Sequence, residues 1–303
     1  MSDQASAQEG PFSEDANRRR VFKQLRRDLS TERLDSFRSR EPGLNAESNP
    51  DLLEKYAHNL VVAQAFYPAL HMVEILLRNR TFEAIKSHLG AAPGVAPCTQ
   101  DKRTYDAHQV KLGKLSRHEC TVSWLDLRKG DLTPEDREAM LKGRDRGHKR
   151  SDRFGKTFTE GRLIAALDLN FWVRLFGGNY SYGGHAGLTL WPDLLPRVFP
   201  EASAAEISDR DRVEARLERV KATRNSIFHQ EPVAIESARD SYEEIMTVIR
   251  HMSPTSEAAI RRIDGFEWAI HQGTRLAMRE KLDALHDCPL PIKAEVGVAP
   301  TAE

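Results

Sequence analysis

Apolar side chains recur at helical spacing along most of the chain. Over residues 58–89 they return mostly every three or four positions, the period of a helix with one buried stripe. Pro68 lies inside this pattern, so a kink or a split into two helices is expected there. No segment alternates apolar and polar residues as a half-buried strand does, which predicts an all-α fold. The same period predicts further helices over 159–177, 209–229, 237–252 and 255–271.

Local capping signals predict two more helix starts. Ser30 or Thr31 can cap a first helix that places Leu34 and Phe37 inward. Thr133 is a natural N-cap for a short helix, because a proline takes the first helical position and an aspartate follows three residues after the cap.

Composition divides the chain into a helical domain and two tails. Residues 1–19 are mostly small and polar, and residues 288–303 are rich in proline and alanine, so both are expected to be disordered. The folded domain then covers 20–287. Within it, periodicity is lost near 90–120 and 178–200, which predicts long irregular connections.

Charge and cysteine content limit the partners and the cell compartment that we expect for this protein. The 45 basic and 45 acidic side chains cancel, so any attraction to nucleic acid must come from a local patch. Cys98, Cys120 and Cys288 are odd in number and widely spaced, which favours a reducing compartment, and we expect a cytoplasmic protein. No window of about 18 apolar residues is apparent, so no membrane span is expected.

A polar constellation interrupts the apolar stripe of the 209–229 segment. Leu217 and Val220 mark the stripe, and the position four residues further on is Arg224. His229 follows about 140° around the helix and about 7.5 Å along it, within reach of the arginine. Two interpretations stay open. Arg224 could simply lay its stem along the core while Asn225 and His229 cap the helix, or the group could form a site.

A second constellation lies on the 58–89 segment. Glu74 and Arg78 are one helical turn apart, and Glu74 shares a face with buried positions. A carboxylate beside buried surface needs a partner, and Arg78 is the simplest one. An ordinary structural ion pair and a supporting role in a site both remain open.

Several segments of the sequence resemble those of a known family. RNSIFHQEP, which begins at Arg224, resembles the arginine–histidine signature of the HEPN superfamily, and the chain is similar to its Abi-like (abortive infection) proteins. Four further segments occur in the order of that family, and the resemblance covers roughly residues 30–270. These segments are STERLDSF, VEILLRNR, LNFWVRLF and LTLW.

The resemblance implies a fold and an activity. It implies a HEPN-like helical bundle with long irregular connections, acting as a homodimer with one shared cleft, and a metal-independent endoribonuclease used in phage defence or as a toxin. Arg224 and His229 would be the catalytic pair and Asn225 the accompanying polar residue, with Glu74 and Arg78 in support. A neutralising RNA or protein antitoxin is a further partner that the resemblance implies.

The chemistry can be argued without the family. RNA supplies its own nucleophile, the 2′-hydroxyl, so cleavage needs a base, an acid and a cation near the phosphate. Histidine can act as base when neutral and as acid when charged, and arginine offers a fork of donors to the phosphate oxygens. The predicted products carry 2′,3′-cyclic phosphate and 5′-hydroxyl ends. The alternative is a non-catalytic RNA-binding or protein-interaction module on the same fold.

An acidic substrate needs further cations. Residues 142–156 hold seven Lys or Arg against two aspartates, and their glycines suggest a mobile loop. Together with the basic run at 18–27 this loop is the expected RNA-contacting surface, although charge runs are also ordinary solvated faces. The expected RNA-binding residues are Lys142, Arg144, Arg146, Lys149, Arg150 and Arg153.

Neither a metal nor a cofactor is expected. Cys98, His108, His118 and Cys120 have the right chemistry for zinc, but their spacing matches no compact pair of zinc ligands. No glycine-rich segment has the lysine and hydroxyl residues of a phosphate-binding loop.

Overall fold

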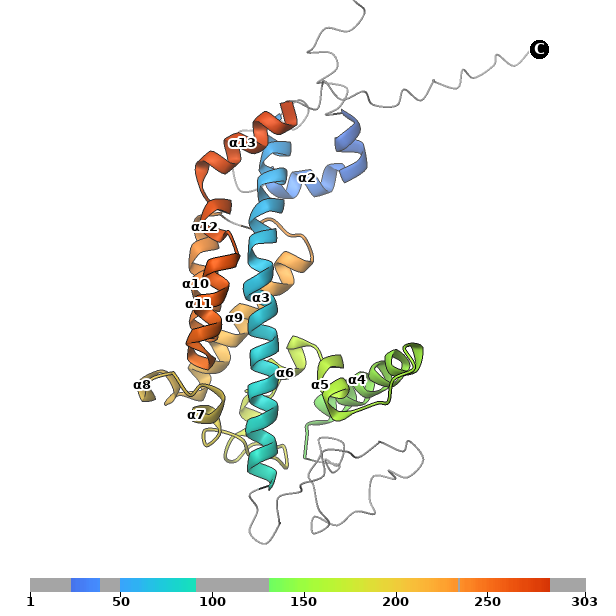
Figure 1. Ribbon diagram of the computed structural model, residues 1–303, viewed down its shortest axis with the longest axis vertical. Coiled ribbons are helices and arrows are strands. Elements are labelled where there is room, and N and C mark those ends of the chain that lie inside the picture. Colours follow the sequence, from blue (N-terminus) through green and yellow to red (C-terminus); the bar gives the residue numbers. More distant parts are fainter. Residues whose placement is uncertain (1–22, 39–49, 91–130, 234, 284–303) are drawn as a thin grey trace, which may run out of the picture. The chain divides into compact units, whose positions relative to one another are not determined.

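The fold is all-α, as the hydrophobic pattern predicts. The computed structural model describes residues 23–38, 50–90, 131–233 and 235–283 (Figure 1). In this part of the chain 77% of the residues are helical and no strand is formed. The chain divides into two compact units, residues 1–63 with 267–303, and residues 64–266. The predicted tails lie outside the described residues.

The first unit contains the predicted N-terminal helix. Helix α2 spans Thr31–Arg38, and the Ser30 hydroxyl accepts a hydrogen bond from the backbone N–H of Arg33 at 3.3 Å, so the predicted cap is confirmed. Leu34 and Phe37 are buried, and the Phe37 ring packs edge-on against Tyr56 of helix α3.

Helix α3 contributes to both units and is continuous. It spans Pro50–Gly90, so the helix is not split at Pro68. Proline removes one backbone donor, but Phe66, Ala69 and Val73 around it are fully buried, and this burial favours a continuous helix.

One part of α3 contradicts the expectation of no apolar window. Residues Leu52–His88 are long and apolar enough, by length and composition, to cross a membrane, with a mean hydropathy of 1.6 in the relevant window. The protein buries 44% of that window. A core helix of a soluble protein meets the same criteria, so this is weak support for a span.

In the first unit, two polar contacts join the start of α3 to the C-terminal helices. Helix α12 spans Phe266–Ala269 and helix α13 spans Gln272–Asp283. Arg275 Nε donates to Glu54 Oε1 at 2.6 Å, and His58 Nε2 lies 2.8 Å from the Ala269 carbonyl oxygen. Both Glu54 and His58 are buried, so each contact gives a buried polar group a partner.

In the second unit, helices α9, α10 and α11 form a bundle with α3. They span Arg210–Phe228, Ile235–Met252 and Pro254–Ile263. The Tyr242 ring of α10 stacks on Phe266 at 3.9 Å between centroids, and both rings meet Phe66 of α3. The predictions for 209–229 and 237–252 are confirmed. The segment 255–271 is not one helix, because Gly265 at φ 62° separates α11 from α12.

The predicted helix of 159–177 is also two helices. Helix α5 spans Glu160–Ala166 and helix α6 spans Leu169–Arg174. Asp168 starts a new helix between them, since its side chain accepts a hydrogen bond from the backbone N–H of Phe171 at 2.9 Å. The following segment is mostly irregular, as predicted, with only the short turn η2 (Gly178–Tyr180) and helix α7 (Leu195–Val198) before residue 200.

Helix α4 corrects the expectation of a mobile loop at 142–156. It begins at Pro134 after the predicted cap Thr133, and it continues to Arg153. Gly143 and Gly147 are one turn apart and buried, and their missing side chains make room for neighbours. A Cβ at Gly143 would lie 2.6 Å from Leu167, and a Cβ at Gly147 would lie 2.6 Å from Phe158. These glycines therefore serve close packing rather than flexibility.

We expect Gly147→Val to destabilise the protein by about 1–3 kcal/mol, because the added side chain overlaps the buried Phe158 ring and forces it to move. Urea denaturation followed by circular dichroism measures the loss. Gly161→Ala on α5 is the control, since its nearest neighbour would be 3.9 Å away and alanine favours helix by up to about 1 kcal/mol. Equal stability of the two variants would contradict the packing role.

Candidate functional site

The C-terminal end of α9 carries the motif found in the sequence. His229 is the residue at which the helix ends, and its backbone N–H donates to the Asn225 carbonyl oxygen at 2.8 Å. Gln230 takes a left-handed conformation at φ 58°, so that the N–H of Glu231 reaches the Ser226 carbonyl oxygen at 2.8 Å. This backbone arrangement closes the helix end with its carbonyls satisfied. The His229 side chain is exposed beside it.

Arg224 is held by three side chains. Its guanidinium carbon lies 4.2 Å from the centre of the Phe228 ring, its Nη1 donates to Asn225 Oδ1 at 3.3 Å, and its Nε lies 3.9 Å from Glu74 Oε2. The Arg224 and Glu74 side chains are each 28% exposed. At 3.9 Å the carboxylate attracts the charge without a hydrogen bond. The arginine is therefore oriented while part of its fork stays accessible.

The two polar constellations meet in space, which differs from the expected pairing. Glu74 was expected to pair with Arg78, but the ion pair that it forms is with Arg224, about 150 residues further along the chain. The Nε atoms of Arg78 and Arg224 are both buried and have no hydrogen-bond partner among the described residues. Buried donors of this kind are rare in folded proteins, and each one calls for an explanation.

Two exposed aromatic rings lie together near the end of α9, one of them against Arg224, and sequence reasoning missed them. Tyr67 of α3 and Phe228 of α9 are 46% and 44% exposed, and their ring centres are 5.1 Å apart. Phe228 could have been found, because residues four apart on a helix are neighbours and an arginine over an aromatic ring is favourable. Tyr67 could not, because its neighbours come from a distant part of the sequence.

Most of the predicted RNA-binding cations share one exposed face of α4. At about 100° per residue, Lys142, Arg146, Lys149 and Arg153 fall within about 60° of one another around the helix, with Arg150 at the edge of this face. All five are exposed. Arg144 is half-buried on the other side, with Asp145 Oδ1 3.7 Å from its Nε.

Some of these cations already have local partners. Lys142 pairs with Glu138 at 2.6 Å, and Arg146 donates to the Ala166 carbonyl oxygen at 2.9 Å. Exposed pairs of this kind are weak and exchange readily for a phosphate. The basic run at 18–27 is described only from Lys23, where a short helical stretch reaches residue 29.

Helix α6 connects the first turn of α4 to the C-terminal half of α9. Arg174 of α6 donates to the buried Asp136 of α4 at 2.6 Å. On its other side, Asn170 of α6 accepts a hydrogen bond from Lys221 of α9 at 3.2 Å, one turn before Arg224. The cationic helix and the arginine–histidine helix end thus belong to one packed set of helices.

In the described part of the chain, metal ligands do not gather near this site. Among the described residues, no group of three or more His, Cys, Asp or Glu side chains is placed to hold a metal ion. Cys98, His108, His118 and Cys120, the zinc alternative weighed from the sequence, lie outside the described residues.

No protein-family model, no curated protein and no solved structure matches this chain. The similarity to Abi-like HEPN proteins therefore stays a prediction. The groups at the end of α9 and on the exposed face of α4 are the features that bear on function.

Proposed function

We propose that the protein is a metal-independent endoribonuclease of the HEPN type, in which Arg224 and His229 are the catalytic pair. The observation that carries the proposal is the end of α9, where Glu74 and Phe228 orient Arg224 and the His229 imidazole is exposed five residues further on. By resemblance to Abi-like proteins, the biological role is phage defence or toxin-like growth arrest, in the cytoplasm.

The reaction needs only groups of this chain and the RNA itself. A neutral His229 takes the proton from a 2′-hydroxyl, and the 2′ oxygen forms a bond to the adjacent phosphorus. The bond from phosphorus to the 5′ oxygen then breaks, and a charged imidazole protonates the leaving oxygen. Arg224 donates to the nonbridging oxygens as charge builds on them. A homodimer would supply the second imidazole from its other copy.

Asn225 links the two catalytic groups. Its side-chain oxygen accepts from Arg224 Nη1, and its backbone oxygen accepts from the N–H of His229. We propose that it positions the guanidinium relative to the helix end. Glu74 acts through charge from α3, and Arg78 adds a second cation on the same helix.

A second candidate function is a non-catalytic RNA-binding module, which the exposed cationic face of α4 favours. Such a face neutralises phosphates without reading sequence, and it needs no reactive histidine. Both candidates predict RNA binding, so only cleavage separates them.

The decisive experiment incubates the purified protein with total RNA in EDTA. The proposal expects cleavage, with fragments that carry 2′,3′-cyclic phosphate and 5′-hydroxyl ends, detected by enzymatic end-labelling before and after removal of the cyclic phosphate. Binding without cleavage favours the module. Fragments with 3′-hydroxyl and 5′-phosphate ends would overturn the mechanism, because those ends come from attack by an activated water.

The double variant Lys149→Ala, Arg153→Ala is expected to bind single-stranded RNA more weakly and with less salt dependence. Each lost phosphate contact should lower the slope of log affinity against log salt by about 0.7. Fluorescence anisotropy at several salt concentrations measures this slope. The control Arg197→Ala, Arg262→Ala removes two exposed arginines from α7 and α11. The same slope in both double variants would show that α4 does not contact RNA.

A further inference from the structure

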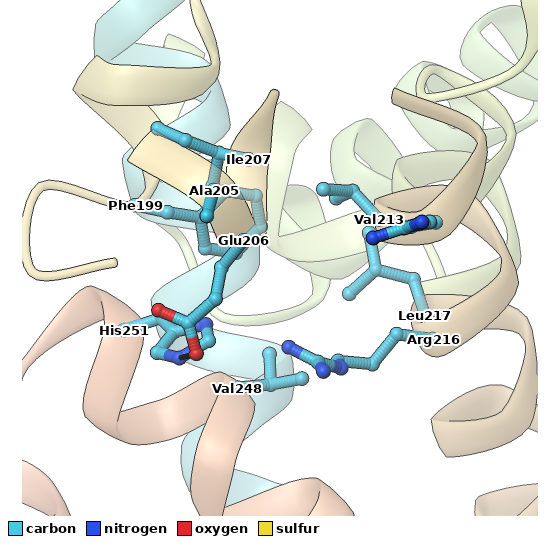
Figure 2. Close-up of a pocket in the computed structure, with 10 residues that line it drawn as sticks. Phe199, Ala205, Glu206, Ile207, Val213, Arg216, Leu217, Val248 and His251 are labelled. Atoms are coloured by element: carbon cyan, nitrogen blue, oxygen red, sulfur yellow. Dashed lines mark ion pairs between the residues drawn. The ribbon is translucent and has the colours of Figure 1, made fainter. Parts of the chain in front are cut away.

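A cavity of about 280 Å³ lies in the second unit, away from the residues of the proposed reaction. Helix α8 (Ala204–Ile207) covers it, and α9 and α10 form its walls (Figure 2). Buried apolar side chains of Phe199, Leu217 and Val248 line it. Its volume suits a small molecule of about one ring rather than a macromolecule.

One wall of the cavity is a fixed pair of an acid and an imidazole. His251 is 5% exposed, and its Nε2 lies 3.0 Å from Glu206 Oε1. The other oxygen of Glu206 accepts from the backbone N–H and the hydroxyl of Ser203, at 2.8 Å each. These Ser203 donors lower the pKa of Glu206 to about 2, so it is charged at neutral pH. Burial lowers the pKa of His251 below its usual value, which favours a neutral ring.

The opposite wall contains Arg216, whose guanidinium has hydrogen-bond donors available for a ligand. The Arg216 side chain is 34% exposed, and Figure 2 shows its guanidinium beside Val248 at the cavity. Its nearest acid in the described part of the chain is Glu244, whose Oε1 is 4.0 Å away and too distant for a hydrogen bond. Glu244 already accepts from Arg219, whose Nε–H is shared between the two Glu244 oxygens at 2.9 Å and whose Nη2 donates to Oε1 at 2.5 Å.

A second arginine adds charge at the same edge. Arg212 lies one turn before Arg216 on α9 and also lines the cavity. Its Nε is 3.3 Å from Asp209 Oδ2, and its side chain is 77% exposed. The carboxylate of Glu206 is already stabilised by the donors of Ser203. Arg212 and Arg216 therefore favour the binding of one further negative charge at the cavity edge.

We propose that this cavity binds a small monoanion with a compact apolar body, an aromatic or branched carboxylate. The apolar body would fill the space between Phe199, Leu217 and Val248. The carboxylate would accept hydrogen bonds from the guanidinium of Arg216. A carboxylate matches the planar guanidinium with two parallel hydrogen bonds. A phosphate dianion is disfavoured, because the fixed negative charge of Glu206 faces it across the cavity. This site is independent of RNA cleavage.

The test uses 4-fluorobenzoate as the probe, followed by ¹⁹F NMR in a titration with the full-length protein. The neutral isostere 4-fluorobenzamide and inorganic phosphate, which is tested by competition, are the comparison ligands. We expect saturable binding of the carboxylate, binding of the amide at least about tenfold weaker, and no competition by phosphate.

Two matched variants locate the binding. Arg216→Gln is expected to weaken 4-fluorobenzoate at least about tenfold, whereas Arg262→Gln removes one exposed arginine from α11 and should leave the affinity unchanged. Arg216→Lys should restore part of the affinity, which a merely misfolded variant would not do. Absence of saturable binding, equal binding of acid and amide, or equal affinity of the two glutamine variants would each overturn the proposal.

Discussion

Replacing His229 by alanine is expected to reduce RNA cleavage by about 10²–10⁴-fold while RNA binding is retained. The side chain supplies the proton transfer in the proposed reaction, whereas the helix end is closed by backbone hydrogen bonds of His229, Gln230 and Glu231 that alanine keeps. The fold should therefore survive. Initial rates on a labelled RNA in EDTA, with binding measured in parallel, give both quantities.

The control for this variant is His185→Ala, which removes another exposed histidine of the second unit. It is expected to cleave like the unaltered protein. If His229→Ala and His185→Ala cleave equally well, the imidazole of His229 is not the catalytic base, and any cleavage comes from another group or a contaminating nuclease. Arg224→Lys adds a finer comparison, because lysine keeps the charge and loses the planar fork.

The sequence was sufficient to find the charged and polar residues of the proposed site, but not the Phe228 ring against Arg224 or the arrangement of these groups. The stripe of α9 put Arg224 on its inner side, and the predicted helix end at residue 229 is one residue beyond the observed end at Phe228. The ion pair between Arg224 and Glu74 was not, because it joins two helices about 150 residues apart. Spacing along one helix favoured Arg78 as the partner, and only the packing of α3 against α9 decides otherwise.

Two local signals were ambiguous for physical reasons. Glycine makes a loop flexible, but it also lets neighbouring segments approach a helix closely. The second effect applies at Gly143 and Gly147, because the side chains of Leu167 and Phe158 occupy the space beside them. An aspartate within an apolar run can be a surface residue of a helix or the cap of a new one. Asp168 is a cap, and apolar periodicity alone does not reveal it.

The largest stability effect is expected at the junction of α4 and α6. Asp136 is 3% exposed, and its carboxylate accepts hydrogen bonds from Arg174 Nε at 2.6 Å, Tyr180 Oη at 2.6 Å and Thr133 Oγ1 at 2.7 Å. From the sequence Asp136 had only a capping role. In the structure it also joins α4 to α6 and η2. Burial, together with the hydrogen bond to this carboxylate, raises the pKa of Tyr180.

We expect Asp136→Ala to lower the free energy of unfolding by about 3–5 kcal/mol, because it leaves the Arg174 guanidinium and the buried Tyr180 hydroxyl without their shared acceptor. Glu135→Ala is the matched control. It removes the neighbouring carboxylate, which also pairs with Arg174, at 3.2 Å, but whose side chain is 76% exposed, so a loss of at most about 1 kcal/mol is expected. Urea denaturation with a check that the m-value is unchanged measures both. A difference between the two variants of less than about 1 kcal/mol would show that the buried carboxylate does not hold these helices together.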